Sequence, residues 1–372
     1  MSLTALIMSI DILFVTHGFN LGGAEVLVVK MACQLPESYS SAVLALDQSG
    51  DLQSELDARG IKNAVVGRKP GWQLKNFSEF FKYVRAYSPR LIHAHQYTPF
   101  LYSVLYKILF NWNCKLIFTE HGRHLPDLVS FKRKLANQVL SLFINRVTAV
   151  CEFTKRSLTS NEKLPNAIQV IYNGIDLEAQ SAPSLRAEFG ISDKDTLIGY
   201  VGSLRSIKNP AFLITALGRV KTKNSNIKLV LIGEGSLKLD LIKLAEQLEI
   251  TSDVYFAGSR FPASAYISQF DIFVQPSLCE AHSLALLESM ARAVPAIVTN
   301  VGGASESIQD GVNGLLVESN SVESLSDAIL NLINNAELRS RLALAGRESY
   351  QQRFTFNKMF SQYLELYDEL LS

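Results

Sequence analysis

The chain has 372 residues, of which 48% are hydrophobic and 19% are charged; this composition is typical of globular proteins and excludes disordered, collagen-like and coiled-coil classes. Its length favours two domains, and its net charge of +1 gives no bulk excess for binding nucleic acid. The charge is unevenly distributed, because residues 1–176 carry 19 basic and 13 acidic side chains whereas the remainder carries 17 and 22. We therefore expect two lobes with different tasks.

The four cysteines are widely separated and show no CxxC or Cys/His spacing that binds zinc, which indicates a reducing compartment and no metal site. We expect no signal peptide, because the apolar start lacks a basic region and Asp11 interrupts it. No run of 18 apolar residues is present to span a membrane. The sequence thus predicts a cytoplasmic protein.

Short apolar runs alternate with longer helical patterns along the chain. Such runs, without polar alternation, are typical of parallel strands that helices cover on both faces. In the first half we expect strands at Ile10–Thr16, Ser41–Leu46, Lys62–Val66, Leu91–His95, Lys115–Thr119 and Val147–Cys151. In the second half we expect them at Leu197–Val201, Ile227–Ile232, Val254–Ala257, Asp271–Gln275, Ala296–Thr299 and Gly314–Val317, and a helix at Phe356–Leu371.

Each half has enough strands for a doubly wound sheet, and the chain divides near the turn dipeptide Asn173-Gly174, before the polar stretch Glu178–Arg186. The predicted domains are residues 1–176, residues 177–355, and a C-terminal helix over 356–372 that packs back on the first domain. Open α/β sheets bind ligands at the carboxyl ends of their strands. Functional residues should therefore follow strands.

Two motifs follow strands in the first half. Gly22 and Gly23 precede a helical run, where paired glycines allow close approach of a ligand and the helix start offers N–H groups to an anion; alternatively they form a plain strand-to-helix turn. In Thr119–His124, His121 beside a glycine can present a polar group to a sugar hydroxyl or a reacting oxygen. We interpret His93 as a hydrogen-bonded core residue.

The loop Gly202–Asn209 carries two cations, Arg205 and Lys208, before a helix. Arginine can grip two phosphate oxygens and lysine supplies a mobile charge, so the pair suits a diphosphate. A solvated loop is the alternative. The position of the loop at the carboxyl end of the first strand of this half favours a binding site.

Glu280 and Glu288 bracket the start of a helix that we expect near Ser283, with Leu284 on its buried stripe. Carboxylates withdrawn from water need hydrogen-bond donors, which ligand hydroxyls supply. The free N–H groups at the helix start suit a phosphate. Together these features describe a sugar-nucleotide site; an exposed pair of glutamates is the alternative.

With these motifs the chain resembles the retaining GT-B glycosyltransferases of group 1 (family 4) over nearly its whole length. The resemblance implies two Rossmann-like domains that face each other across a cleft. The motifs occur in the order of that family: Gly22–Glu25, Thr119–Gly122, Asn173–Asp176, Arg205 and Lys208, Gly233–Gly235, Glu280 with Glu288, Gly302–Glu306 and Asp310–Gly314.

The resemblance also implies roles for these residues. Glu288 would hold the ribose, and Glu280 the hydroxyls of the donor sugar. Arg205 and Lys208 would neutralise the leaving diphosphate without a metal or cofactor, and His121 would line the reaction centre. The remaining donor-binding residues would be Gly22, Gly23, Gly233, Gly235, and the segment of His282, Ser283, Leu284 and Ala285.

Two departures from the family pattern bear on the donor site. Ser203 stands where the family has arginine, so Arg205 is a less secure phosphate ligand than Lys208, and Asn209 replaces a glycine. His282 and Ser283 replace the frequent Phe-Gly, which implies a different sugar preference. Ser283 is also suited to cap the helix.

On the acceptor side, three basic residues from Lys132 precede Leu135, Val139, Leu140 and Phe143. In this family such a stretch, with the apolar segment from Phe100 to Trp112, can dock the first lobe on an anionic membrane. The alternative, which we favour here, is a core helix with a solvated basic end.

We expect retaining transfer of a hexose from a nucleoside diphosphate sugar, a uridine one, to a glycan or lipid-linked acceptor in cell-surface polysaccharide or glycolipid synthesis. A sugar-nucleotide 2-epimerase of the same architecture and a non-catalytic two-lobed sugar-binding protein are the alternatives. An NAD-dependent enzyme fits poorly because neither half opens with GxGxxG.

Overall fold

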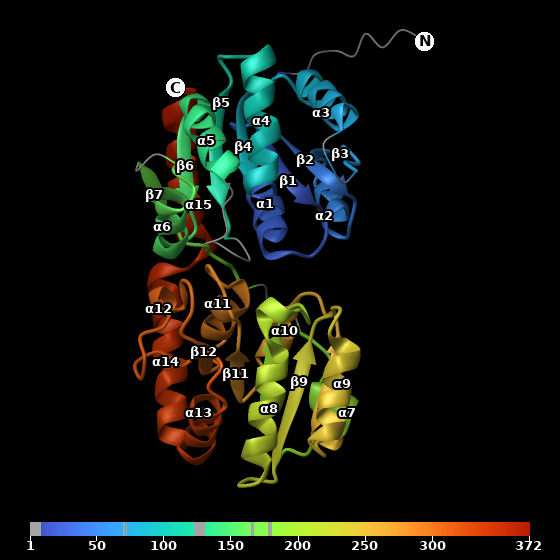
Figure 1. The fold of residues 1–372 in the computed structure, drawn as a ribbon, viewed down its shortest axis with the longest axis vertical. Helices are drawn as coiled ribbons and strands as arrows, with labels where there is room; N and C mark the ends of the chain where they lie inside the picture. The colour runs from blue at the N-terminus through green and yellow to red at the C-terminus, as the bar shows by residue number, and fades with distance from the viewer. Residues whose placement is uncertain (1–8, 70, 72, 123–130, 165–166, 178–180) are drawn as a thin grey trace. The chain divides into compact units, whose positions relative to one another are not determined.

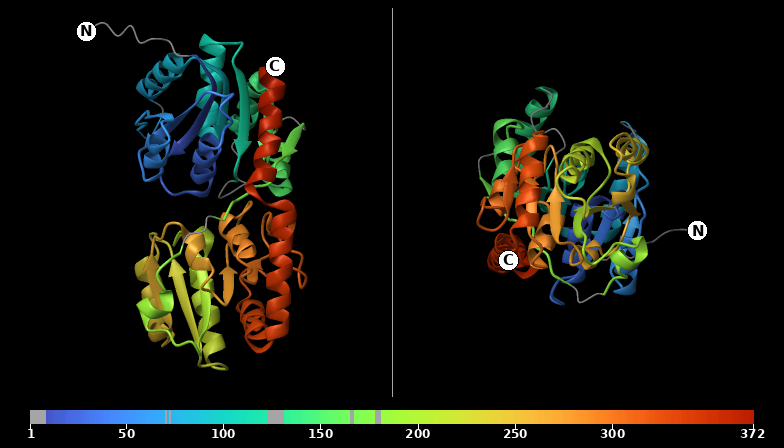
Figure 2. Two further views of the ribbon diagram at one scale, coloured as in Figure 1. Left: turned by 180° about the vertical axis from the view of Figure 1, so that it is seen from behind. Right: turned by 90° about the horizontal axis from the view of Figure 1, so that it is seen from below.

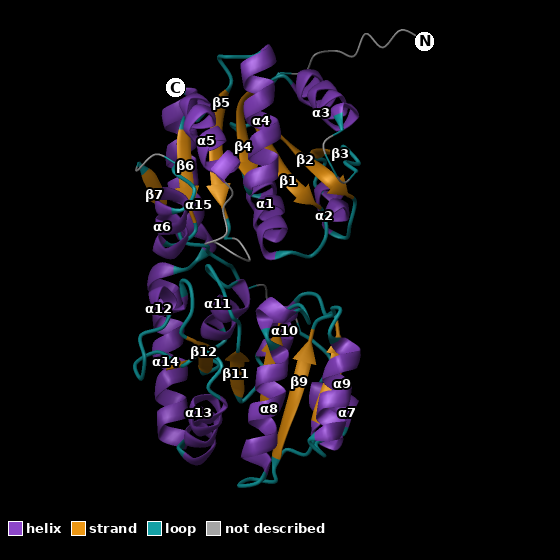
Figure 3. Cartoon of the chain, viewed as in Figure 1, coloured by secondary structure: helices purple, strands orange, loops and turns teal. Residues whose placement is uncertain are grey.

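The computed structural model describes residues 9–69, 71, 73–122, 131–164, 167–177 and 181–372. It forms two compact units: Met1–Tyr172 with Phe360–Ser372, and Asn173–Met359. Each unit is an α/β domain in which strands alternate with helices along the chain (Figures 1 and 3). This architecture confirms the predicted fold class of two Rossmann-like sheets. Part of the polar stretch predicted after the division, residues 178–180, lies outside the described residues.

The sheet of the first unit is parallel, with the strand order β3-β2-β1-β4-β5-β6-β7. Its central strands are buried on both faces, as the unbroken apolar runs predict. Its strands are β1 (Ile10–Gly18), β2 (Ser41–Gln48), β3 (Lys62–Val65), β4 (Pro89–His95), β5 (Lys115–Glu120), β6 (Arg146–Ala149) and β7 (Ile168–Val170). Only β7 is absent from the sequence prediction, because the polar, exposed Gln169 at its centre leaves no unbroken apolar run.

Helices cover both faces of this sheet. They are α1 (Gly23–Cys33), α2 (Leu52–Ala58), α3 (Leu74–Tyr87), α4 (Tyr97–Phe110), α5 (Phe131–Leu140), the 3₁₀ turn η1 (Ser141–Phe143), α6 (Glu152–Ser160) and α15 (Phe356–Leu371). α4 lies on one face and α15 on the other, as Figures 1 and 2 show from opposite sides. From α15, the Tyr367 hydroxyl bonds to buried His93 on β4 at 2.7 Å.

The sheet of the second unit is also parallel, with the order β10-β9-β8-β11-β12-β13. Its strands are β8 (Thr196–Val201), β9 (Ile227–Ile232), β10 (Val254–Gly258), β11 (Ile272–Gln275), β12 (Ala296–Thr299) and β13 (Leu315–Val317). Its helices and 3₁₀ turns are α7 (Leu185–Phe189), η2 (Ser206–Lys208), α8 (Pro210–Lys221), α9 (Lys238–Gln247), η3 (Thr251–Asp253), α10 (Ala263–Ile267), α11 (Leu284–Ala291), α12 (Ala304–Ser307), α13 (Val322–Asn334) and α14 (Ala336–Arg353).

The segment that enters the second unit is fixed to the end of that unit. A Cβ on Gly174 would lie 2.3 Å from the Thr355 carbonyl oxygen, so only glycine fits there. Ile175 forms a parallel bridge with Thr355, and the Tyr350 hydroxyl donates to the Ile175 carbonyl at 2.9 Å. The Asn-Gly dipeptide therefore packs against the last turns of the unit.

Candidate active site

Each sheet has a switch point, where two adjacent strands lead to helices on opposite sides. In the second unit it lies between β8 and β11, and in the first between β1 and β4. Open α/β sheets bind ligands at the carboxyl edge beside such a point. The loops after β8 and β11 carry the predicted donor residues, and the loop after β1 carries the glycine pair.

Lys208 and Glu280 meet at the switch point of the second unit. Lys208 ends η2 in the loop after β8, and its ammonium donates to the Glu280 carboxylate in the loop after β11. Their side chains are 29% and 15% exposed, so solvent reaches both. The Ser277 hydroxyl donates to the same carboxylate oxygen at 3.3 Å. The structure thus brings together the cation and the carboxylate that the sequence predicts as site residues.

A glycine fixes the backbone beneath Glu280. Gly302, in the loop after β12, has a φ of +60°, and a Cβ there would lie 1.9 Å from the Glu280 carbonyl oxygen. The Gly303 N–H donates to that oxygen at 2.9 Å. Only glycine combines this backbone conformation with such a close approach, so the glycine pair holds the Glu280 loop in place.

Two further glycines hold the loop that carries Lys208. At Gly233, with a φ of +139°, a Cβ would lie 2.0 Å from the Gly202 carbonyl oxygen, and at Gly235 it would lie 2.3 Å from that of Leu204. The Leu204 N–H donates to the Glu234 carbonyl at 2.9 Å. Both predicted donor-binding glycines therefore have a packing reason to be glycine, and contact with a ligand stays a prediction.

Helix α11 begins where the sequence predicts. Ser283 is its N-cap, and the Ser283 hydroxyl accepts a hydrogen bond of 3.4 Å from the Leu286 N–H. Leu284 is half-buried rather than part of the fully buried stripe, which starts at Leu286. The first N–H groups of a helix have no partner within it, and no described residue accepts from those of Leu284 and Ala285. These N–H groups can bind an anion.

The other two residues of this segment lie differently. Glu288 is half-buried in the second turn of α11. The His282 ring is buried against Phe354, with ring centroids 5.1 Å apart, and its carbonyl accepts from the Asn173 amide at 2.9 Å. Burial lowers the pKa of His282 to about 3, so the imidazole is neutral at pH 7. A ligand role for His282 would have to come from its backbone.

Arg205 differs from Lys208 in its surroundings. Its side chain is exposed, and no described residue forms a hydrogen bond or ion pair with it. The Arg205 carbonyl accepts from the Lys208 N–H at 3.0 Å, which closes the turn between them. The structure thus joins Lys208 to Glu280 and leaves the guanidinium of Arg205 outside this pair.

In the first unit, His121 follows β5 and contacts a histidine at the end of the neighbouring strand. His95 Nδ1 and His121 Nε2 are 2.9 Å apart. His93, as predicted, is a buried core residue, bonded to Thr119 and Tyr367 at 2.7 Å each. The sequence reasoning gave His95 no role in the site, although its position at a strand end was a usable signal. Arg123 and His124, at the end of the predicted motif, lie outside the described residues.

Gly22 and Gly23 lie at the start of α1, and Gly22 is the N-cap without a side-chain bond.

Nearby, His17 on β1, Asp47 on β2 and Arg68 after β3 form a charged cluster that the sequence reasoning also missed. Asp47 accepts from Arg68 Nε at 2.6 Å and lies 3.0 Å from His17 Nδ1. Although burial acts to raise it, these bonds bring the pKa of Asp47 below its ordinary value. The ion pair and hydrogen bonds of Asp47 therefore place charged side chains at the carboxyl edge of the sheet, near the glycine pair.

The basic amphipathic stretch forms α5 and η1, and several of its apolar residues face solvent, although Leu140 is buried and Phe143 half-buried. Phe131 is 79% exposed, Leu135 57% and Val139 55%, and Leu142 in η1 is 79% exposed. The favoured interpretation of a core helix is therefore wrong for this face, because only Asn137 and Leu140 are buried. Exposed side chains at the end of α4 extend the patch: Leu109, Phe110 and Trp112, whose ring lies 5.2 Å from that of Phe143.

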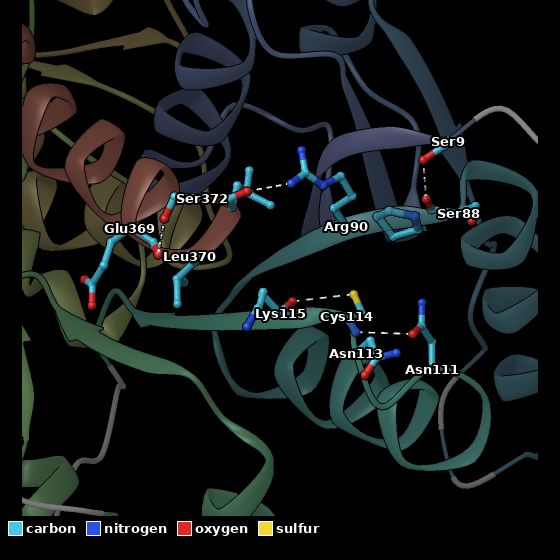
Figure 4. A pocket seen from close by; sticks show the side chains of 12 residues that line it. Ser9, Ser88, Arg90, Asn111, Asn113, Cys114, Lys115, Glu369, Leu370 and Ser372 are labelled. Atoms are coloured by element: carbon cyan, nitrogen blue, oxygen red, sulfur yellow. Dashed lines mark hydrogen bonds between the residues drawn. The ribbon is translucent and has the colours of Figure 1, made fainter.

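Described residues of the first unit line at least two cavities. One of about 280 Å³ lies near the carboxyl edge and is lined by Arg68, Phe77 and the start of α4. Another of about 480 Å³ lies at the opposite, amino-terminal edge, between Arg90, Cys114 and the end of α15 (Figure 4). Its position away from the carboxyl edge separates this second cavity from the predicted site. No group of three or more potential metal ligands occurs within the described ranges.

Comparison with known proteins gives matches along both units. Residues 181–349 match the family model "Glycosyl transferases group 1", and residues 21–179 match "Glycosyltransferase Family 4". The chain is 27% identical to the N-acetyl-alpha-D-glucosaminyl L-malate synthase of Bacillus anthracis, over 82% of this chain and 81% of the relative. It is 25% identical to the O-antigen biosynthesis glycosyltransferase WclY of Escherichia coli, over 94% and 95%.

The fold resembles that of HepE from Anabaena, crystallised with UDP and glucose. The TM-score is 0.84 at 20% identity, and the similarity covers 96% of this chain and 99% of the other. The similarity of fold therefore spans both units of this chain. None of the helices described here has the length and apolarity to cross a membrane.

Proposed function

This chain belongs to the group 1 glycosyltransferases, and we propose that it transfers a hexose, with retention of configuration, from a uridine diphosphate sugar to a glycan or lipid-linked acceptor. The observation that carries this proposal is the Lys208–Glu280 pair beside the free N–H groups of α11. The UDP complex of the HepE structure and the O-antigen role in the name of WclY support the donor and the pathway.

In this proposal the diphosphate lies between Lys208 and the start of α11. Lysine and helix N–H groups stabilise the negative charge that develops as the phosphate leaves, so no metal or cofactor is required. Glu280 accepts hydrogen bonds from the hydroxyls of the donor sugar, and Glu288 from those of the ribose. Arg205, being exposed, is free to move toward the phosphates when donor binds.

Transfer breaks the bond between C1 of the sugar and the phosphate oxygen and forms a bond from C1 to the acceptor oxygen on the same face. The proton of the acceptor hydroxyl passes to the leaving phosphate oxygen, so no nucleophile from the protein is consumed. In this scheme the residues of the second unit hold and polarise the donor. His121 is proposed to give a polar contact to the reacting oxygen.

We expect a uridine diphosphate hexose to raise the melting temperature of the protein. A ligand at about 100 times its dissociation constant adds about 2.7 kcal/mol to stability. The measurement is thermal unfolding with a panel of nucleoside diphosphate sugars, each compared with the free sugar. A panel in which no nucleotide sugar shifts the transition would contradict the proposal, and a larger shift with another base would change the donor.

Product analysis separates the proposal from the alternatives. With donor but no acceptor, a 2-epimerase yields an altered sugar nucleotide, whereas a transferase yields at most nucleoside diphosphate and free sugar. A binding protein yields neither. Because the name of one relative, an N-acetyl-alpha-D-glucosaminyl L-malate synthase, contains L-malate, small hydroxy acids belong in the acceptor panel beside glycans and lipid-linked sugars.

We further propose that the α5 patch docks on an anionic membrane at the cytoplasmic face, where a lipid-linked acceptor would be reached. The patch combines exposed Phe131, Leu135 and Leu142 with Lys132 and Lys134, and α5 has no acidic residue. Apolar side chains that enter the interface beside cations attracted to anionic headgroups are the features of such helices.

The double substitution Phe131→Ser with Leu135→Ser is expected to weaken binding to phosphatidylglycerol vesicles at least tenfold, because burying each side chain contributes about 1.5–3 kcal/mol. Co-sedimentation with vesicles measures this. The matched control replaces Leu239 and Leu344, which are 72% and 66% exposed on α9 and α14 of the second unit, by serine. The docking proposal would be wrong if the α5 variant and the control variant bound these vesicles equally. It would also be wrong if the native protein bound neutral vesicles as strongly as phosphatidylglycerol vesicles.

A further inference from the structure

His95 and His121 share a single hydrogen bond whose direction has chemical consequences. His95 Nδ1 and His121 Nε2 are 2.9 Å apart, at the ends of adjacent strands β4 and β5. Burial lowers the pKa of His121 to about 4 and that of His95 well below its ordinary value. Both rings are therefore neutral at pH 7, and each carries one ring proton. One ring must donate and the other accept.

The surroundings of His95 determine which ring donates. The second nitrogen of His95, Nε2, is buried, and no described group bonds to it. If His95 accepted through Nδ1, its proton would be on Nε2 as a buried N–H without an acceptor, which is rare in native proteins and costs about 1–3 kcal/mol. If His95 donates through Nδ1, Nε2 carries only a lone pair. The second arrangement is the less costly one.

We propose that His95 is a positioning residue that donates its Nδ1 proton to His121 and thereby holds His121 in the tautomer protonated at Nδ1. His121 then presents an N–H donor at Nδ1, where no described residue bonds to it. That donor suits an oxygen of the substrate, such as a sugar hydroxyl. The part of this inference that concerns substrate rests on the proposed function.

The packing around His95 leaves its ring little freedom to turn. The His95 ring lies 4.0 Å from that of His93, which Thr119 and Tyr367 hold from both sides at 2.7 Å. The next residue, Gln96, has a φ of +71°, a conformation that costs a residue with a side chain about 1–3 kcal/mol. Strain of this kind persists only where the neighbouring structure imposes it. The end of β4 therefore holds the His95 ring in one orientation toward His121.

This tautomer determines whether His121 can donate a hydrogen bond or accept a proton. With Nε2 occupied by His95 and Nδ1 already protonated, neutral His121 has no lone pair left to take the proton of an acceptor hydroxyl. It can stabilise an oxygen by donating a hydrogen bond, but it cannot serve as the general base. The proton of the acceptor then has to leave by another route, which agrees with its proposed transfer to the phosphate oxygen.

The tautomer can be measured directly by NMR of the full chain labelled with nitrogen-15 in its six histidines. The His121 signals are assigned by their loss in His121→Asn. We expect the native His121 to be protonated at Nδ1 at pH 7. We expect His95→Leu to shift His121 toward the Nε2-protonated form, and His95→Asn, whose amide can donate from the place of Nδ1, to restore it.

Native His121 protonated at Nε2, or a His95→Leu variant that keeps the native tautomer, would overturn the inference. Tyr367→Phe is the control, because it removes a buried hydrogen bond of the same cluster without touching His95 or His121. It should leave the tautomer unchanged, whereas an effect equal to that of His95→Leu would indicate general loosening of the core.

Kinetics with the donor identified by the thermal panel provide the functional readout. His95→Leu should lower kcat about 10- to 100-fold, the range seen when the partner that orients a metal-bound histidine is lost, with little change in KM for the donor. His95→Asn should recover most of that loss. If the tautomer is as expected but no nucleotide sugar is turned over, the proposed function fails and the histidine assignment stands.

Discussion

Replacing Lys208 by methionine is expected to lower kcat about 100- to 1,000-fold, the effect typical of removing one preorganised group that stabilises developing charge. Methionine keeps the length of the side chain but removes the ammonium that faces Glu280. The folded state should change little, because Glu280 is 15% exposed and retains the bond from Ser277. Steady-state kinetics and thermal unfolding of the same preparation measure the two effects.

Lys238→Met is the matched control, since Lys238 forms an ion pair of 2.9 Å with Glu234 in the same unit. Exposed pairs of this kind contribute about 0–1 kcal/mol, and we expect near-normal turnover. Glu280→Gln should resemble Lys208→Met, and the double variant should lose less than the product of the two because the pair acts as a unit. Near-normal activity of Lys208→Met would refute the site assignment.

The described strands other than β7 could be predicted from sequence because their apolar runs are short and unbroken. That pattern also placed Lys208 and Glu280 after strands. Their contact could not be predicted, because it depends on β8 and β11 being neighbours although 72 residues separate the two side chains. Strand order is set by the packing of the whole sheet and leaves no local signal.

The incorrect prediction for α5 and the unassigned role of His95 also reflect tertiary contacts that leave no local signal. Apolar residues at helical spacing predict a core face, and α5 has this spacing, but its buried side is formed by Asn137 and Leu140 while Leu135 faces solvent. The contact of His95 with His121 could not be predicted, because the two residues are 26 positions apart and meet only where the ends of β4 and β5 are neighbours. The spacing of apolar residues shows which side chains could be buried. Which of them are buried depends on the tertiary contacts.

A second large effect is expected from Gly302→Ala. The added Cβ would lie 1.9 Å from the Glu280 carbonyl oxygen, at a φ of +60°. The obstacle is backbone rather than a flexible side chain, so the Glu280 loop must move and the bond from Gly303 must lengthen or break. We expect a loss of about 3 kcal/mol or more in stability, and loss of the donor-induced thermal shift.

Gly190→Ala separates the effect of the close approach from that of the backbone angle. Gly190 ends α7 with a φ of +64°, and no atom lies within 4 Å of a Cβ placed there. Its cost should be that of the left-handed conformation alone, about 1–2 kcal/mol, with donor binding intact. If both variants lost stability equally and both still bound donor, Gly302 would be a turn residue only. If Gly302→Ala alone abolishes the shift, Glu280 depends on the loop after β12 for its position, and the donor site extends from β8 to β12.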